Sequence, residues 1–311
     1  MIRKGKENCI PKIIAASAGI FLLYAPLFLL DLDDRLFQLV AEHLTPGTVK
    51  ARSIWLPNYR AVIEGKAIAG VECNASGITY SHETGTLFII LNGPTQIVET
   101  DLRGNALRII DLAGFEDTEA ICHMGGHRFA VVEERKSRIT VIRIDEETRS
   151  ITRNAQPGVT LALSAAGNKG FEGIAWNGNA RRFTVVKERS PLAIYEIRLP
   201  SGDGSSPPSR EVTRPPGIDP EALYLKDLSG LHFHEATGNL LMISDESRLL
   251  AEVDPQGKQV SFLELSKGFS GLTADVPQAE GVAMDGAGTI FVISEPNLFY
   301  AFRKPVPLPN S

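Results

Sequence analysis

One short pattern recurs five times along this chain of 311 residues, and it constrains the fold more than any other feature. Each copy has a small or acidic residue, then Gly or Ala, then an aliphatic residue that begins a strand. A turn follows, and a second apolar strand ends in polar residues. The copies begin at Ser76, Glu119, Glu172, Ser229 and Glu280. Four-stranded repeats of roughly 40 to 55 residues are typical of β-propeller blades, so we predict an all-β propeller.

The fifth repeat is short, and this bears on how the ring closes. After its second strand it contains one more strand, 298–303, and then three prolines. The segment Trp55 to Ile63 precedes the first repeat and has no repeat of its own, so we expect it to supply the missing strand and remove the open edge. We predict five blades, with six as the alternative if a degenerate copy lies near Leu161 or Ala274.

Two other segments allow predictions about individual blades. In the second repeat, Ser150 to Asn154 follows a turn and is predicted as the fourth strand. The stretch Ser201 to Pro220 is rich in Ser, Pro and Gly, which predicts an inserted surface loop.

The N-terminus predicts a membrane anchor. Four basic residues lie within 1–12, and residues 13–30 are uncharged and almost wholly apolar, at the short end of a membrane span. The basic flank favours a cytoplasmic N-terminus, and the run ends in a poor cleavage site. We therefore expect a single-pass protein of a bacterial inner membrane with its C-terminal domain in the periplasm. The predicted parts are a cytoplasmic flank (1–12), a transmembrane signal anchor (13–30), a linker (31–53), the propeller (54–305) and a tail (306–311).

Charge and motif content exclude several functions. The net charge is −5 and there is no long basic block, so the chain is a poor candidate for binding nucleic acid. It has no nucleophile elbow, P-loop or dinucleotide fingerprint, and no Cys/His zinc spacing. Cys73 and Cys122 are predicted as free thiols rather than a disulfide. His232 and His234 could share one side of a strand, but we interpret them as structural because no third ligand accompanies them.

Polar residues should converge at one end of the central channel. The first strand of a blade lines the channel and pairs antiparallel with the second, so the start of one lies beside the end of the other. The predicted inner ring is Ser76, Glu119, Glu172, Ser229 and Glu280. The predicted second ring is Asn92, Glu133, Lys187, Asp245 and Glu295, with Asp117 two residues before Glu119.

Three glutamates around one axis repel one another, so something must compensate their charge. A hard cation such as Ca²⁺ would suit Glu119, Glu172 and Glu280 as ligands. A network of basic side chains, including Arg135 and Arg189, is a second solution, and protonation of one glutamate is a third. The glycines that follow the ring residues, such as Gly77 and Gly230, are expected to permit close approach of neighbouring strands.

The segments NYRAVIEGKAIAGV, NASGITY, NKGFEGIAW, DLSGLHFH and PQAEGVAMD, in this order, resemble the SdiA-regulated family over about Asn58 to Arg303. This resemblance implies an N-terminal membrane segment and a propeller domain, but no particular reaction.

A looser similarity is to calcium-dependent propeller lactonases of the paraoxonase and gluconolactonase type. In those enzymes a glutamate before Gly-Pro ligates the ion. Glu172 and Glu280 are followed by Gly here, but Ile174 and Val282 replace the proline, and Ala120 follows Glu119. No catalytic residue can be assigned from this similarity.

These observations support three functions. The first is a membrane-anchored propeller that binds a small molecule, together with Ca²⁺, at the face formed by the two rings. The second is a metal-dependent hydrolase of lactones or phosphoesters, in which the ion would polarise an oxygen of the substrate. The third is a scaffold that binds another envelope protein.

Overall fold

The computed structural model describes residues 39–305, except 41, 157, 161–169, 189–190 and 199–210. The chain divides into two compact units, Met1–Pro46 and Gly47–Ser311. In the first unit, residues 39–40 and 42–44 are helical. The predicted anchor at 13–30 lies outside the described residues. Within the described ranges, no helix is long and apolar enough to cross a bilayer.

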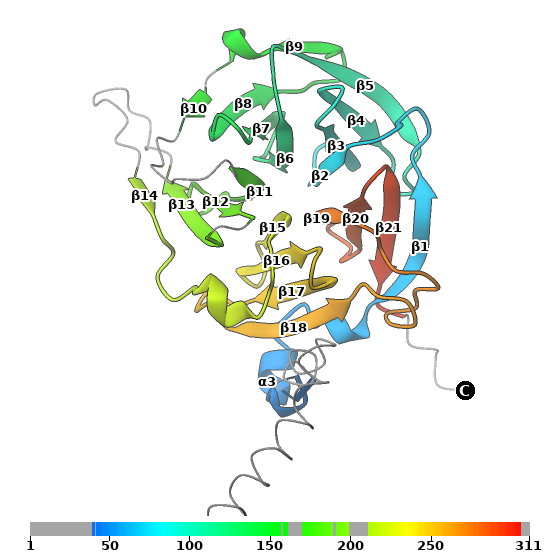
Figure 1. The fold of residues 1–311 in the computed structure, drawn as a ribbon, viewed down its shortest axis with the longest axis vertical. Coiled ribbons are helices and arrows are strands. Elements are labelled where there is room, and N and C mark those ends of the chain that lie inside the picture. The colour runs from blue at the N-terminus through cyan, green and yellow to red at the C-terminus, as the bar shows by residue number, and fades with distance from the viewer. Residues whose placement is uncertain are drawn as a thin grey trace, which may run out of the picture. The chain divides into compact units, whose positions relative to one another are not determined.

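The second unit is a propeller of five sheets arranged around a central axis (Figure 1), as the repeats predict. The first blade contains β2 (Ala75–Ser81), β3 (Thr86–Leu91), β4 (Gln96–Thr100) and β5 (Ala106–Ala113); the second contains β6 (Thr118–His123), β7 (Arg128–Glu133), β8 (Arg138–Arg143) and β10 (Gly158–Thr160). The third contains β11 (Phe171–Asn177), β12 (Arg182–Lys187), β13 (Ala193–Arg198) and β14 (Glu211–Thr213); the fourth contains β15 (Gly230–His234), β16 (Asn239–Ser244), β17 (Leu249–Val253) and β18 (Gln259–Glu264).

The fifth blade joins the two ends of the ring, which confirms the predicted closure. It consists of β19 (Ala279–Met284), β20 (Ile290–Ser294), β21 (Leu298–Arg303) and the N-terminal strand β1 (Arg60–Ala67). β1 runs antiparallel to β21, with Arg60 opposite Arg303 and Ala67 opposite Leu298. The strand begins later than predicted because Leu56–Asn58 forms a 3₁₀ turn with proline in its first positions.

The second and third blades differ from the prediction at their outer edges. β9 (Ser150–Thr152) is not the fourth strand of the second blade, because it pairs in parallel with β5 of the first blade. The outer strand of the second blade is β10, which pairs with β8. In the predicted surface loop, Glu211–Thr213 forms the outer strand β14 of the third blade.

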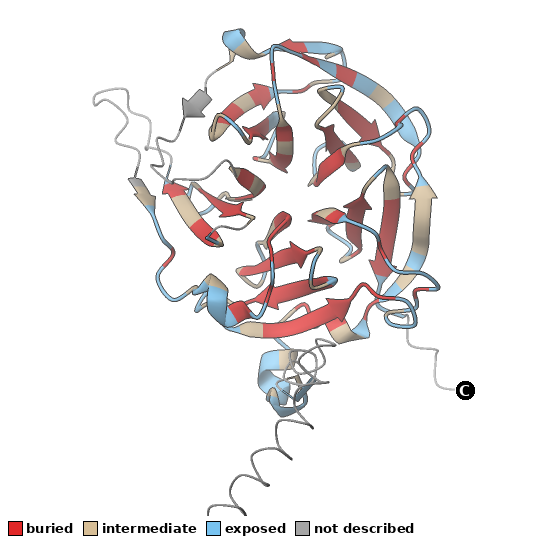
Figure 2. Ribbon diagram, in the orientation of Figure 1, coloured by how far each residue is buried: buried red, intermediate tan, exposed pale blue. Residues whose placement is uncertain are grey.

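Burial is greatest in the inner and middle strands of the blades (Figure 2). Apolar side chains from each pair of adjacent blades form a shared core cluster. The fully buried strand β16, for example, is flanked by β15 and β17 in a sheet with apolar side chains on both faces. Between the first and second blades, the rings of Phe88 and Phe129 pack with centroids 4.6 Å apart. Close contact between sheets of this kind fixes the radius of the ring and hence the width of the channel.

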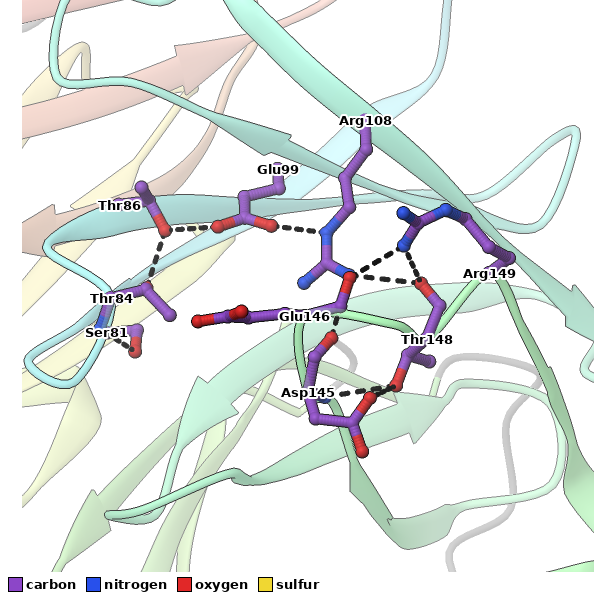
Figure 3. A network of polar contacts seen from close by, with 9 residues as sticks. All are labelled: Ser81, Thr84, Thr86, Glu99, Arg108, Asp145, Glu146, Thr148 and Arg149. Atoms are coloured by element: carbon purple, nitrogen blue, oxygen red, sulfur yellow. Dashed lines mark hydrogen bonds and ion pairs between the residues drawn. The ribbon is translucent and has the colours of Figure 1, made fainter.

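Away from the channel, a polar network joins the first blade to the connection that follows β8 (Figure 3). The Arg108 Nε donates to Glu99 Oε2 at 2.5 Å, and the Thr86 hydroxyl donates to the other oxygen of Glu99 at 2.6 Å. The guanidinium of Arg108 also donates to three backbone carbonyls of the connection, those of Asp145, Glu146 and Thr148. The charge of Glu99 is therefore compensated within the protein.

Candidate functional site

The inner-ring residues face the channel because most of the inner strands have a β-bulge at their start. Register shifts in four blades leave one residue unpaired, and these residues are Ser76, Glu119, Glu172 and Glu280. A bulge turns the side chain of its extra residue away from the regular alternation. In the fourth blade, Ser229 lies at the same level, where its N–H donates to Ile243 O at 3.0 Å. The structure thus places the five predicted inner-ring residues at equivalent positions.

The outer ring is formed by the first residue after each second strand. The N–H groups of Asn92, Glu134 and Glu295 donate to carbonyls at equivalent positions, those of Asn74, Asp117 and Gln278. By the strand bounds, the remaining members are Glu188 and Asp245. Asn92, Asp245 and Glu295 were predicted here. We call the inner and outer rings together the carboxylate mouth.

In the second and third blades, the residue that we predicted for the second ring stands one position before the residue that occupies it. Glu133 and Lys187 are the last residues of β7 and β12, and both are buried. Because side chains alternate between the faces of a strand, a shift of one residue places them on the other face. Glu133 Oε1 lies 3.3 Å from the Arg153 guanidinium and accepts a bond from the Glu116 N–H at 3.2 Å.

Three carboxylates of the mouth form a compact group. Oxygen atoms of Asp117, Glu119 and Glu134 all lie within 4.8 Å of one another. The Asn92 amide donates to Glu119 Oε1 at 2.5 Å. Among the predicted metal ligands, only Glu119 belongs to this group. Asp117 and Glu134 were missed, although Asp117 stands two residues before Glu119 in the sequence.

Asp117 is held in an unusual conformation. Its φ is 58°, and residues two positions before the ring in the first and fifth blades, Asn74 and Gln278, also have positive φ values. This left-handed conformation is uncommon for residues other than glycine and is often found at functional sites. Asp117 Oδ2 is buried without a hydrogen-bond partner, and Arg135 Nε approaches it at 2.9 Å without hydrogen-bond geometry. The Arg135 side chain is 81% exposed, so its charge is screened by water.

Burial and like charge together raise the pKa values of the inner-ring glutamates. Burial raises the pKa of Glu172 to about 9, and the charges of Glu119, Glu134, Glu188 and Glu280 act in the same direction. Burial raises the pKa of Glu280 to about 8, with Glu295 as the largest contributing charge. Burial also raises the pKa of Glu119 to about 7, which a hydrogen bond from Ser76 opposes. Without a bound cation, protons therefore offset much of the repulsion at neutral pH.

Below the carboxylates the channel narrows at a layer of small residues. An added Cβ would lie 2.7 Å from Glu280 O at Gly230, 2.8 Å from Ile78 N at Gly281 and 3.0 Å from Glu119 O at Gly77. The inner strands approach too closely here for side chains, as the repeats predict. The constriction between this layer and the aliphatic residues that follow holds about 10 Å³, the space of roughly one water molecule.

The other predicted residues have different surroundings. The buried Ser229 hydroxyl donates to Ala279 O at 2.6 Å, so it links the fourth and fifth blades. Arg189 lies outside the described residues. Cys73 is exposed and Cys122 is buried, and both are free thiols as predicted. His232 and His234 lie at the far end of the channel from the carboxylate mouth, on β15.

Comparison with known proteins supports the fold and the resemblance noted in the sequence. A family model described as SdiA-regulated matches residues 51–303, which is most of the chain.

Three solved structures share the fold with low sequence identity. Regucalcin from Agrobacterium tumefaciens strain C58, described as a calcium-binding protein, is 11% identical over 78% of this chain and 92% of its own, with a TM-score of 0.50. A gluconolactonase from Xanthomonas campestris is 10% identical over 84% and 94%, also with a TM-score of 0.50. A luciferin-regenerating enzyme is 13% identical over 78% and 95%, with the same TM-score. At these identities the comparison shows the propeller fold alone.

Proposed function

We propose that this chain, which belongs to the SdiA-regulated family, binds a divalent cation, namely Ca²⁺, at the carboxylate mouth of its propeller. The observation that supports this most directly is the group formed by Asp117, Glu119 and Glu134, whose oxygen atoms lie within 4.8 Å of one another. Hard oxygen ligands with no nitrogen or sulfur favour Ca²⁺ over transition metals. The buried Asp117 Oδ2 has no hydrogen-bond partner, and its ion-pair partner Arg135 is 81% exposed, so a bound cation could replace that contact.

The remaining carboxylates of the mouth extend this site into one for a ligand. Glu172 and Glu280 lie near enough to Glu119 for their charges to affect one another's pKa values. A bound cation would replace the protons that these groups otherwise hold, and its free coordination positions would face a small molecule entering the channel. We propose that this small molecule binds through oxygen atoms that complete the coordination of the ion.

Calorimetric titration of the full-length protein with CaCl₂ tests the proposal. After treatment with a chelator, the protein is expected to bind calcium with micromolar affinity, and the Asp117→Asn/Glu134→Gln variant is expected to lose this binding. Glu147→Gln is a matched control, because Glu147 is an exposed carboxylate in the connection between β8 and β9 and belongs to neither ring. Titration with MgCl₂ under the same conditions tests the preference for the larger ion. Absence of heat from a folded, chelator-treated parent would contradict the proposal.

Proton release provides a second readout of the same site. Because Glu119, Glu172 and Glu280 have raised pKa values, calcium binding near pH 7 should displace protons, and calcium affinity should rise with pH. Titrations in two buffers with different ionisation enthalpies measure the number of protons released. An equal heat in both buffers would show that calcium does not bind at these groups.

A second candidate is a metal-dependent hydrolase at the same mouth. The specific observation that favours it is the same group of Asp117, Glu119 and Glu134, because an ion held by oxygen atoms within 4.8 Å of one another could also act on a substrate. The ion would polarise a carbonyl or phosphoryl oxygen of a lactone or phosphoester. Turnover of such a substrate that is lost on chelation and in Glu119→Gln would support it. Calcium binding without turnover would favour a ligand-binding protein instead.

We also propose that the propeller is anchored in a bacterial inner membrane by residues 13–30 and faces the periplasm. The apolar run and its basic flank support this placement. Digestion of intact spheroplasts with an added protease should remove the propeller and leave a short membrane-bound fragment. Recovery of intact protein from the soluble fraction would contradict it. Crosslinking in spheroplasts would then show whether another envelope protein binds the propeller.

A further inference from the structure

The end of the channel opposite the carboxylate mouth contains a cavity of about 280 Å³. Its floor is formed by five aliphatic residues, one from each inner strand, that directly follow Gly or Ala: Ile78, Ile121, Ile174, Leu231 and Val282. The same five residues line the narrow constriction. The cavity is therefore separated from the carboxylate mouth by an apolar layer. Its volume lies just below the range of about 300–1,000 Å³ found for ligand sites, so it suits a small ligand.

The walls of this cavity are unusually aromatic. Two positions beyond each floor residue, the inner strands carry Tyr80, His123, Trp176, Phe233 and Met284, and all five line the cavity. Tyr80, Trp176 and Phe233 are only half-buried, so part of each ring is open to the cavity. We call this space the aromatic cavity.

The aromatic cavity has a negative rim. Glu83 and Glu235 are exposed at its edge, and no Lys or Arg occurs among the described residues that line it. Burial acts to raise the pKa of Glu83, but a hydrogen bond from the Gly126 N–H at 2.6 Å and the nearby imidazole of His123 act against it, and the pKa is lowered overall. Glu83 is therefore ionised at neutral pH.

One histidine of the cavity contacts this rim, because His123 Nε2 lies 2.9 Å from Glu83 Oε2. Burial lowers the pKa of His232 to about 3, and it also lowers the pKa of His123. Both imidazoles are therefore neutral at pH 7. Besides burial, the charge of Asp285 raises the pKa of Tyr80, so a third carboxylate contributes to the negative potential here.

One carboxylate lies in the neighbourhood of the largest aromatic ring. Glu235 Oε1 and Trp176 Nε1 are each 3.5 Å from the position that a Cβ would take at Gly178, so the two atoms are at most twice that distance apart. A carboxylate beside an indole, with further aromatic rings around the same space, is the arrangement that binds organic ammonium groups in proteins. The ring faces attract the cation, and the carboxylate adds charge attraction without requiring a hydrogen-bond donor.

We propose that the aromatic cavity is a second ligand site, separate from the carboxylate mouth, and that it binds a small organic ammonium cation. The trimethylammonium group of choline is the simplest probe of suitable size. A phosphocholine headgroup carries the same cation, but its phosphate would meet the carboxylates at the rim. We therefore expect the free cation to bind more tightly than the phosphorylated form.

Calorimetric titration of the full-length protein with choline chloride tests this proposal. The matched neutral compound is 3,3-dimethylbutan-1-ol, which has the same shape as choline without the charge. Choline is expected to bind, and the neutral compound and phosphocholine are expected to bind at least about tenfold more weakly. Glu235→Gln and Trp176→Leu should each weaken choline binding about five- to tenfold, whereas Trp176→Phe should retain most of it. Glu147→Gln is the control and should bind like the parent.

Independence from the carboxylate mouth distinguishes this site from the first. Choline binding should be unchanged by excess chelator and in the Glu119→Gln variant. Equal binding of choline and its neutral counterpart would overturn the proposal, as would an unchanged affinity in both Glu235→Gln and Trp176→Leu. Absence of choline binding at millimolar concentration in folded protein would also overturn it. Thermal melts of each variant show whether a loss of binding reflects a loss of fold.

Discussion

Two glutamates of the same propeller show how differently a buried carboxylate can be used. Glu252 on β17 is fully buried and accepts hydrogen bonds from the backbone N–H groups of Ile54 and Trp55, the Asn239 amide and the Ser261 hydroxyl, at 2.6–3.0 Å. Glu172 on β11 is instead surrounded by other carboxylates, which raise its pKa together with burial. Glu252 holds the fold together, whereas Glu172 adds to its electrostatic cost.

This contrast distinguishes carboxylates that stabilise the fold from carboxylates that are available to bind a ligand. Glu99, like Glu252, has its charge compensated locally, by Arg108 and Thr86 (Figure 3). The inner-ring glutamates cluster with other carboxylates at the channel. Repulsion of this kind destabilises the folded protein unless a proton or a cation compensates it. Cation binding is the compensation that we propose for the inner-ring glutamates.

The pH dependence of unfolding should show the largest effect. The pKa values of Glu119, Glu172 and Glu280 are raised from an ordinary 4.5 to about 7, 9 and 8, so the folded state binds more protons than the unfolded state between these limits. The metal-free protein should therefore lose stability as pH rises from about 4.5 to about 9. Each pKa unit corresponds to about 1.4 kcal/mol, so the total loss should reach several kcal/mol.

Chemical denaturation across this pH range, with chelator present, measures the effect. Calcium should flatten the profile by replacing the protons. A free energy of unfolding of the metal-free protein that rises steadily from pH 5 to pH 9 would show that these carboxylates are compensated within the protein. They would then not differ from Glu252.

A matched pair of substitutions should shift stability in opposite directions. Glu252→Gln replaces one accepting oxygen with an NH₂ group that faces donors, and it should cost about 2–3 kcal/mol. Glu172→Gln removes a group that must take up a proton to fit among the other carboxylates at pH 8, and it should stabilise the metal-free protein there by about 1 kcal/mol or more. Urea denaturation of both variants compares them directly. Destabilisation by both substitutions to the same extent would remove the distinction that we draw.

The glycine layer under the mouth offers a test of geometry rather than charge. An added Cβ at Gly230 would lie 2.7 Å from Glu280 O and 3.0 Å from the Gly281 Cα, so Gly230→Ala must push the fourth and fifth blades apart. We expect a loss of about 1–3 kcal/mol in stability and weaker calcium binding. At Gly286 an added Cβ would meet nothing within 4 Å, so Gly286→Ala is the control. Equal melting temperatures for the two variants would contradict the close approach of the strands.

The smallest effect is expected at Arg135. Its side chain is 81% exposed and lies 2.9 Å from Asp117 Oδ2, so its removal should change stability by less than about 0.5 kcal/mol. Arg135→Gln should nevertheless tighten calcium binding a few-fold, because it removes a cation that competes for Asp117. Weaker calcium binding in this variant would indicate that Arg135 orders the site instead.

The sequence predicted the number of blades and the closing strand because both depend on local signals. Gly-rich turns and alternating apolar residues mark the strands, and the short fifth repeat shows where one is missing. The position of β9 could not be predicted, because its pairing with β5 is a contact between blades that leaves no local pattern. The same limit applies to the start of β1, which is shifted by the turn at Leu56–Asn58.

The sequence predicted which strand ends form the candidate site, but it did not predict every side chain that faces the channel. The inner ring could be predicted because the bulged residue always stands before Gly or Ala. Glu133 and Glu134 are adjacent carboxylates after the same apolar run, and only the exact end of β7 decides which one faces the channel. The left-handed conformation of Asp117 brings it beside Glu119, and nothing in the residue types alone indicates that turn.

The pairing of β1 with β21 has a consequence for how the protein is made. During synthesis β1 emerges early, but its partner emerges only after the other four blades have been translated. Pairings between residues so distant in sequence form slowly, because the chain must close a long loop first. Until then the unfinished ring exposes unpaired strand edges, which can associate with other chains. The last blade thus completes the folding of the whole ring.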